Sequence, residues 1–218
     1  MLHRLREPAN GATHGIGVIL SVAALGVLLW LGWRGGSVAL FVGFAVFGLS
    51  QLTLYIASTL YHSLRISEAG IRQLLRFDCA MVFVFIAGTY TPVCLVALEG
   101  GWRWGLLALI WGLALGGGAM KLRWLHAPVW LSTGFYVLMG WVAVLALPAL
   151  VRAVPPGGIF WMFAGGIIYT VGAVIFALDR PALVPGVFEA HALWHLFVLA
   201  GSACFFWMMV RYIAPLAG

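Results

Sequence analysis

The chain has 218 residues, of which 64% are hydrophobic and only 8% are charged, and its mean hydropathy is +1.07. A soluble domain carries roughly 25% charged residues, so this composition excludes an ordinary globular protein. The net charge of +6 does not indicate nucleic-acid binding, because the basic residues form no Lys- or Arg-rich run and fall between long apolar segments.

Seven uncharged runs of 17 to 30 residues divide the chain, and each is near or above the length that a helix needs to cross the hydrocarbon layer. They predict an all-α integral membrane protein: a single domain, 1–218, that forms a seven-helix transmembrane bundle. The predicted spans are 13–33, 38–61, 77–98, 104–120, 127–149, 158–178 and 190–212. The longest predicted connection is 62–76, where the residues after Ser67 have the pattern of a short interfacial helix.

The basic residues also predict the orientation, because cytoplasmic loops carry an excess of Lys and Arg. Eight of them fall on the side of the N-terminus and four on the opposite side. The first group is Arg4, Arg6, Arg65, Arg72, Arg76, Lys121, Arg123 and Arg180, and the second is Arg34, Arg103, Arg152 and Arg211. This bias predicts a cytoplasmic N-terminus and, with seven spans, an outside C-terminus.

Small and aromatic residues predict how the spans pack. Glycines gather in the fourth span, where small residues let helix backbones approach closely. Tryptophans lie near the ends of several spans, which is typical of an interfacial aromatic belt rather than a ligand cage. The residues concerned are Gly112, Gly116, Gly117 and Gly118, and Trp30, Trp33, Trp102, Trp104, Trp124, Trp130 and Trp207.

Polar residues inside or at the ends of the spans are the informative ones in so apolar a chain. Ser58 and His62 close the second predicted span, Asp78 opens the third, and His191 and His195 open the seventh. Since consecutive spans run in opposite directions, all five fall on the side of the N-terminus. We therefore predict that they form one site.

The spacing of these residues predicts a metal centre. His191 and His195 are four residues apart and project from the same face of a helix, so both can bind one cation, and His62 supplies a third nitrogen. Three protein ligands plus a water are typical of catalytic zinc, although imidazole also suits copper, iron and nickel. We expect Asp78 to orient or deprotonate that water and Ser58 to bind the water or an oxyanion. The alternatives are ordinary interfacial histidines and an Asp78 paired with Arg72 or Arg76.

The start of the first span carries further polar residues with weaker signals. Asn10 or Thr13 is predicted to cap the helix. For His14, capping and interfacial roles are favoured over a place in the site. Glu7 lies at the same mouth, and His126 is predicted to be interfacial.

These motifs together resemble the hemolysin III family, the bacterial branch of the progestin and adiponectin receptor (PAQR) superfamily. The resemblance rests on Ser58-Thr-Leu-Tyr-His62, Phe77-Asp78 with Gly88-Thr-Tyr-Thr-Pro92, Gly166-Ile-Ile-Tyr-Thr-Val-Gly172, His191-Ala-Leu-Trp-His195 and the opening Glu7-Pro-Ala-Asn10-Gly-Ala-Thr-His14-Gly15. It covers essentially the whole chain. It implies seven helices, a cytoplasmic N-terminus and Zn²⁺ bound by His62, His191 and His195, with Asp78 and Ser58 beside the metal.

The superfamily includes alkaline ceramidases, so the resemblance implies a zinc-dependent hydrolase of a lipid amide or ester that takes a membrane lipid or fatty acyl substrate. It also implies a multi-pass protein of the bacterial cytoplasmic membrane. The alternatives are a non-enzymatic membrane sensor with structural zinc and a hemolysin-like lytic protein. A transporter is less favoured, because the charges do not follow a path across the membrane.

Overall fold

The computed structural model describes residues 6–217, so Arg4, one of the residues counted for the orientation, lies outside that range. The described residues form helices and contain no β-strand. Seven helical segments are long and apolar enough to cross a membrane, as predicted. They are Pro8–Arg34, Val38–Ser63, Glu68–Ala97, Gly100–Arg123, Val129–Ala153, Pro156–Leu178 and Ala190–Ala217.

Four of the spans are single α-helices and three change their helix type. The single helices are α1 (Pro8–Arg34), α2 (Val38–Ser63), α4 (Gly100–Arg123) and α7 (Pro156–Leu178). In the third span α3 (Glu68–Pro92) continues as a π-helix, Val93–Ala97. The fifth consists of α5 (Val129–Trp141), a 3₁₀ turn (Val142–Ala146) and α6 (Leu147–Ala153), and the seventh of α8 (Ala190–Met208), a π-helix (Met209–Ile213) and a 3₁₀ turn (Ala214–Ala217).

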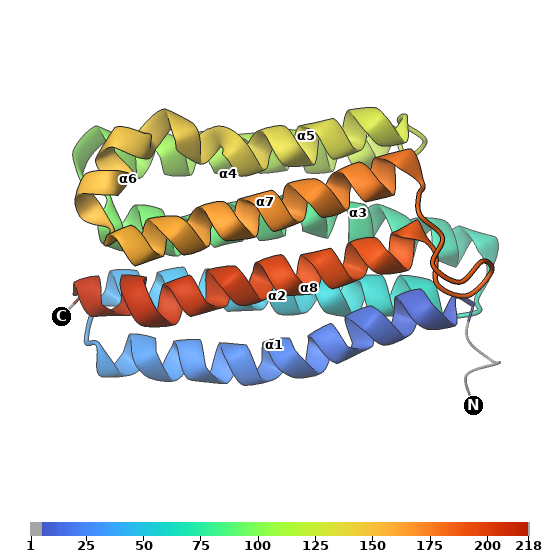
Figure 1. The fold of residues 1–218 in the computed structure, drawn as a ribbon, viewed down its shortest axis with the longest axis horizontal. Helices are drawn as coiled ribbons and strands as arrows, with labels where there is room; N and C mark the ends of the chain where they lie inside the picture. The colour runs from blue at the N-terminus through green and yellow to red at the C-terminus, as the bar shows by residue number, and fades with distance from the viewer. Residues whose placement is uncertain (1–5, 218) are drawn as a thin grey trace.

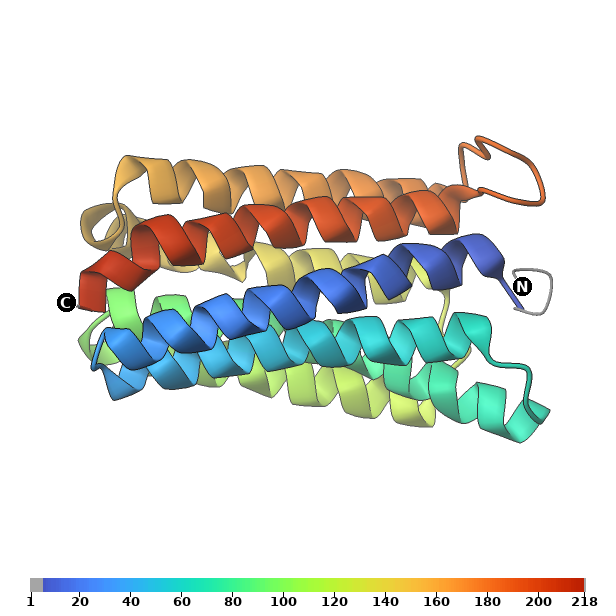
Figure 2. The same ribbon diagram turned by 90° about the horizontal axis from the view of Figure 1, so that it is seen from below.

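The helices lie roughly along one common axis, and neighbours in the sequence pack side by side (Figure 1). Helix α8 also packs against α1, which brings the first and last spans together (Figure 2). Helices α1, α3, α5 and α8 begin at one end of the bundle, and α2, α4 and α7 end there (Figure 1). We call this the N-terminal end.

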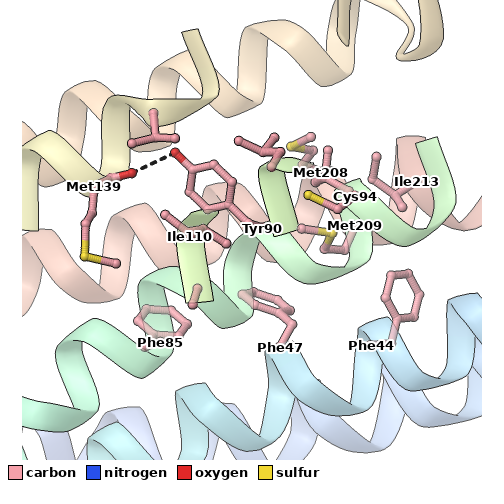
Figure 3. Close-up of a cluster of buried hydrophobic side chains, with 14 of the residues drawn as sticks. Phe44, Phe47, Phe85, Tyr90, Cys94, Ile110, Met139, Met208, Met209 and Ile213 are labelled. Carbon is pink, nitrogen blue, oxygen red and sulfur yellow. Dashed lines mark hydrogen bonds between the residues drawn. The ribbon is translucent and has the colours of Figure 1, made fainter. Parts of the chain in front are cut away.

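An apolar core fills the bundle away from the N-terminal end. Phe47, Phe85 and Ile110 pack there with the buried residues of α8 (Figure 3). The hydroxyl of Tyr90 donates to the backbone oxygen of Met139 at 2.9 Å, so this buried polar group is paired (Figure 3).

The predicted interfacial helix after Ser67 is wrong. The connection between α2 and α3 is only 64–67, and α3 begins at Glu68 and runs without a break into the span. The reason is a helix cap, since the Ser67 side chain accepts a hydrogen bond from the amide of Gly70 at 3.3 Å. The longest connection is instead 179–189, between α7 and α8.

The glycine prediction for the fourth span holds at one position. A Cβ atom on Gly117 would lie 2.3 Å from the ring of Phe83, so this glycine allows α3 and α4 to pack closely. A Cβ on Gly112, Gly116 or Gly118 would meet nothing within 4 Å, because these residues do not face a neighbouring helix. All seven tryptophans assigned to the aromatic belt are exposed, as expected.

Candidate metal centre

His62, His191 and His195 lie together at the N-terminal end of the bundle. Each offers one ring nitrogen, and these three atoms all lie within 4.8 Å of one another. His62 is in the last turn of α2, while His191 and His195 are one turn apart at the start of α8. The structure therefore brings together the three histidines predicted from the sequence, and they could hold a metal ion. We call His62, His191 and His195 the grouped histidines.

Glu7 sets the orientation of the His62 ring. Its Oε2 lies 2.5 Å from His62 Nδ1 and also accepts from Asn10 Nδ2 at 2.9 Å. The hydrogen bond with His62 is the main reason that the pKa of Glu7 falls from 4.5 to about 2, so the carboxylate is ionised and accepts. Since a carboxylate oxygen can only accept, His62 Nδ1 is the donor and Nε2 is the ring nitrogen left for a metal. That Nε2 atom is buried and has no hydrogen-bond partner, as a metal ligand requires.

The first turns of α1 orient His195 in the same way. Its Nδ1 lies 3.2 Å from the backbone oxygen of Asn10 and 3.0 Å from Thr13 Oγ1. The Thr13 hydroxyl itself donates to the carbonyls of Ala9 and Asn10, at 3.1 and 2.9 Å, so it accepts from the ring. Since a carbonyl oxygen can only accept, His195 Nδ1 carries the proton and Nε2 is left for a metal.

These contacts correct the prediction that Asn10 or Thr13 caps the first span. Helix α1 begins at Pro8, its N-cap residue is Glu7, and no side chain caps it. The Thr13 hydroxyl instead contacts His195, and the Asn10 side chain donates to the Glu7 carboxylate that holds His62. The sequence places these residues at the N-terminal end of the bundle, but it does not show that their helix packs against α2 and α8.

His14 belongs to the site, contrary to the capping or interfacial role favoured from the sequence. Its side chain is 3% exposed, and its ring stacks on His195 with a centroid distance of 3.6 Å. Both its ring nitrogens are buried without a partner, although it is not one of the three grouped histidines. Its spacing of four residues from Asn10 is the signal that could have placed it on the same helix face.

A cavity of about 540 Å³ adjoins the histidines. Its wall includes Ser58, Asp78, His191 and His195, and His62 is not among its lining residues. The Ser58 hydroxyl is buried and lies beside the Asp78 carboxyl, with which it interacts. Asp78 forms no ion pair within the described range, and the alternative partner Arg72 pairs with Glu68 at 3.4 Å.

The cavity continues from the histidines toward the middle of the bundle. Along α8 its wall runs from His195 to Phe205, a rise of roughly 15 Å. Along α3 it runs from Asp78 past Phe85 to Tyr90, and most of this part is apolar. The polar groups therefore stand at one end of a long and mostly hydrophobic space.

A model of the haemolysin-III-related family matches residues 2–206. The chain belongs to this family. Hemolysin-3 of Bacillus cereus is 40% identical over 212 residues, which cover 97% of this chain and 93% of that protein. The Hemolysin-3 homolog of Bacillus subtilis is 40% identical over 207 residues, covering 94% and 93%.

The likeness extends beyond the bacterial haemolysin-III proteins. The human monocyte to macrophage differentiation factor is 27% identical over 176 residues, or 77% of this chain and 69% of that protein. This relative supports the place of the haemolysin-III family in the PAQR superfamily. Family membership and seven apolar spans together establish a multi-pass membrane protein.

Proposed function

We propose that the chain is a membrane-embedded zinc hydrolase of a lipid amide or ester. The observation that carries the proposal is the orientation of the histidine rings. His62 and His195 each have Nδ1 held by a hydrogen-bond acceptor, and His62 Nε2 is buried and unpaired. Neutral histidines held in this way by their other nitrogen are the usual ligands of zinc. When bound, Zn²⁺ polarises a carbonyl oxygen and makes a water molecule acidic enough to attack at neutral pH.

Asp78 and Ser58 take the remaining chemical roles. Asp78 is outside the grouped histidines but shares their cavity, so it is placed to hold and deprotonate the attacking water. The Ser58 hydroxyl, on the same wall beside Asp78, is placed to donate to the oxyanion that develops on the substrate carbonyl. Both roles are carried out at one end of the bundle, so neither moves a charge across the membrane.

The apolar part of the cavity supports an acyl chain as the substrate's hydrophobic portion. A chain that lies along Phe85, Val198 and Phe205 would present its carbonyl carbon at the histidine end. The Lys and Arg bias supports a position of that end, and therefore of the reaction, near the cytoplasmic face. In a bacterium this corresponds to the inner leaflet of the cytoplasmic membrane.

The test is to purify the protein, measure its metal content and incubate it with N-acyl and O-acyl lipids. We expect one zinc per chain and release of free fatty acid, and we expect His191→Ala to lose both. His126→Ala is the matched control for zinc content, since His126 is exposed and lies outside the grouped histidines. A zinc-loaded wild-type protein that releases no fatty acid from a broad acyl-lipid panel would refute the proposal.

A structural metal is the second candidate, and one observation favours it. The grouped histidines join α2 to α8, and Glu7, Asn10 and Thr13 tie the start of α1 to the same rings. Metal removal would then loosen three spans at once. Under this alternative, chelation lowers the thermal stability of the protein. Asp78→Asn then leaves unchanged the phenotype that distinguishes cells with the protein from cells without it, whereas the hydrolase requires Asp78→Asn to abolish that phenotype.

A further inference from the structure

Lys121 is a charged residue in the buried stripe of α4. The buried residues of this helix recur at helical spacing and end in a lysine: Leu106, Ile110, Ala114, Gly117 and Lys121. Lys121 is only 5% exposed, so its ammonium does not extend along the surface into water or lipid headgroups. The predicted span 104–120 had left it in a loop, as a marker of orientation, but α4 continues to Arg123.

The packing of α4 on α3 sets the level of Lys121. Gly117 faces the ring of Phe83, and the two helices run in opposite directions. One turn further along α4, Lys121 therefore stands opposite the turn of α3 that holds Asp78 and Cys79. Lys121, Asp78 and Cys79 all line the cavity that adjoins the histidines.

None of the ion pairs within residues 6–217 involves Lys121, whose ammonium lies near the Cys79 thiol. Thr133 on α5 lines the same cavity, is 5% exposed, and has a buried Oγ1 atom without a partner. A buried charge without a counter-ion is unfavourable. The lysine and the unpaired hydroxyl of Thr133 both line this cavity, and together they indicate an anionic ligand. The exposed His126 also lines the cavity, which therefore reaches the surface close to this point.

We propose that Lys121 and Thr133 form an anion-binding subsite for the phosphate, sulfate or carboxylate head group of an amphiphile. The acyl chain of the same molecule occupies the apolar part of the cavity. The carbonyl group of that molecule lies between the head group and the acyl chain, at the histidines. As a statement about substrate, this rests on the proposed hydrolase and narrows its substrate class to anionic acyl lipids. The binding itself requires no turnover.

The test compares three dodecyl amphiphiles that differ in head group: dodecyl phosphate, dodecanol and dodecyltrimethylammonium. Their affinities are measured by displacement of a fluorescent dodecyl probe from the purified protein in neutral-lipid nanodiscs. We expect dodecyl phosphate to bind at least about tenfold more tightly than the other two, since a charge-assisted hydrogen bond contributes an effect of this size. Lys121→Gln is expected to remove the preference and Lys121→Arg to retain it.

The controls separate the subsite from general electrostatics and from misfolding. Arg123→Gln removes an exposed charge from the same end of α4 and should leave the preference intact. Unchanged dodecanol binding shows that Lys121→Gln is folded; if that variant does not fold, Thr133→Val should still weaken dodecyl phosphate binding severalfold. Equal affinity for the three head groups, or a preference that survives Lys121→Gln, overturns the proposal. Displacement of dodecyl phosphate by equimolar inorganic phosphate overturns the assignment to a lipid head group.

Measurements on the wild-type protein and on His191→Ala keep this inference distinct from the proposed function. The variant should keep the preference for dodecyl phosphate while releasing no fatty acid. A wild-type protein that prefers dodecyl phosphate but hydrolyses no lipid refutes the hydrolase and leaves the subsite. Hydrolysis of neutral and anionic acyl lipids at equal rates refutes the subsite and leaves the hydrolase.

Discussion

Replacement of Glu7 by alanine is expected to weaken zinc binding by roughly 10- to 100-fold, the usual effect of removing the group that orients a metal-ligating histidine. Glu7 Oε2 lies 2.5 Å from Nδ1 of a His62 side chain that is 0% exposed. Without this acceptor, Nδ1 is buried and unpaired, at a cost of about 1–3 kcal/mol. The ring is also free to move its proton to Nε2, which removes the lone pair that binds the metal. A mid-range loss of about 2 kcal/mol corresponds to roughly 30-fold.

Glu7→Gln gives a graded comparison. Its amide oxygen can still accept from His62 but carries no charge, and charge-assisted hydrogen bonds are roughly twice as strong as neutral ones. We therefore expect about half the loss in free energy, or roughly fivefold in affinity. The dissociation constant is measured by competition between the metal-free protein and a zinc chelator. Glu68→Ala, which removes a carboxylate that is 92% exposed, is the control. A Glu7→Ala protein with wild-type affinity would refute the assignment of Glu7 to the metal centre.

Three further predictions test other parts of the structure. His195→Ala should abolish zinc binding, while His14→Phe should leave one metal per chain by elemental analysis, since His14 stacks on His195 but is not one of the grouped histidines; loss of zinc in the second variant would make His14 a ligand. Asp78→Asn should retain zinc and lower fatty-acid release by roughly 100-fold or more, the contribution typical of a general base, and normal release would exclude that role. Gly117→Ala should lower the unfolding free energy by about 1–3 kcal/mol, because the new methyl group would meet the Phe83 ring at 2.3 Å. Gly116→Ala, with nothing within 4 Å, should raise it by up to about 1 kcal/mol, and equal thermal shifts for the two variants would contradict the packing described here.

The sequence by itself determined the seven spans and the residues most suited to a site. Uncharged length is a property of one segment at a time, and so is the i, i+4 spacing of His191 and His195. The alternation of the spans then placed His62, Asp78 and the α8 histidines at one level. That level is the end of the bundle at which the structure brings the histidines together.

Only the tertiary structure decided which helix faces meet at that level. Asn10 and Thr13 had the signals of a helix cap, yet they hold the His195 ring, because α1 packs against both α2 and α8. His14 is buried for the same reason. Lys121 counted as one of the basic residues that set the orientation, but the rotation of α4 that places Gly117 against Phe83 also turns this lysine into the cavity. Hydropathy fixes the depth of a residue in the membrane, whereas its neighbours depend on helix rotation, which is set by packing between distant segments.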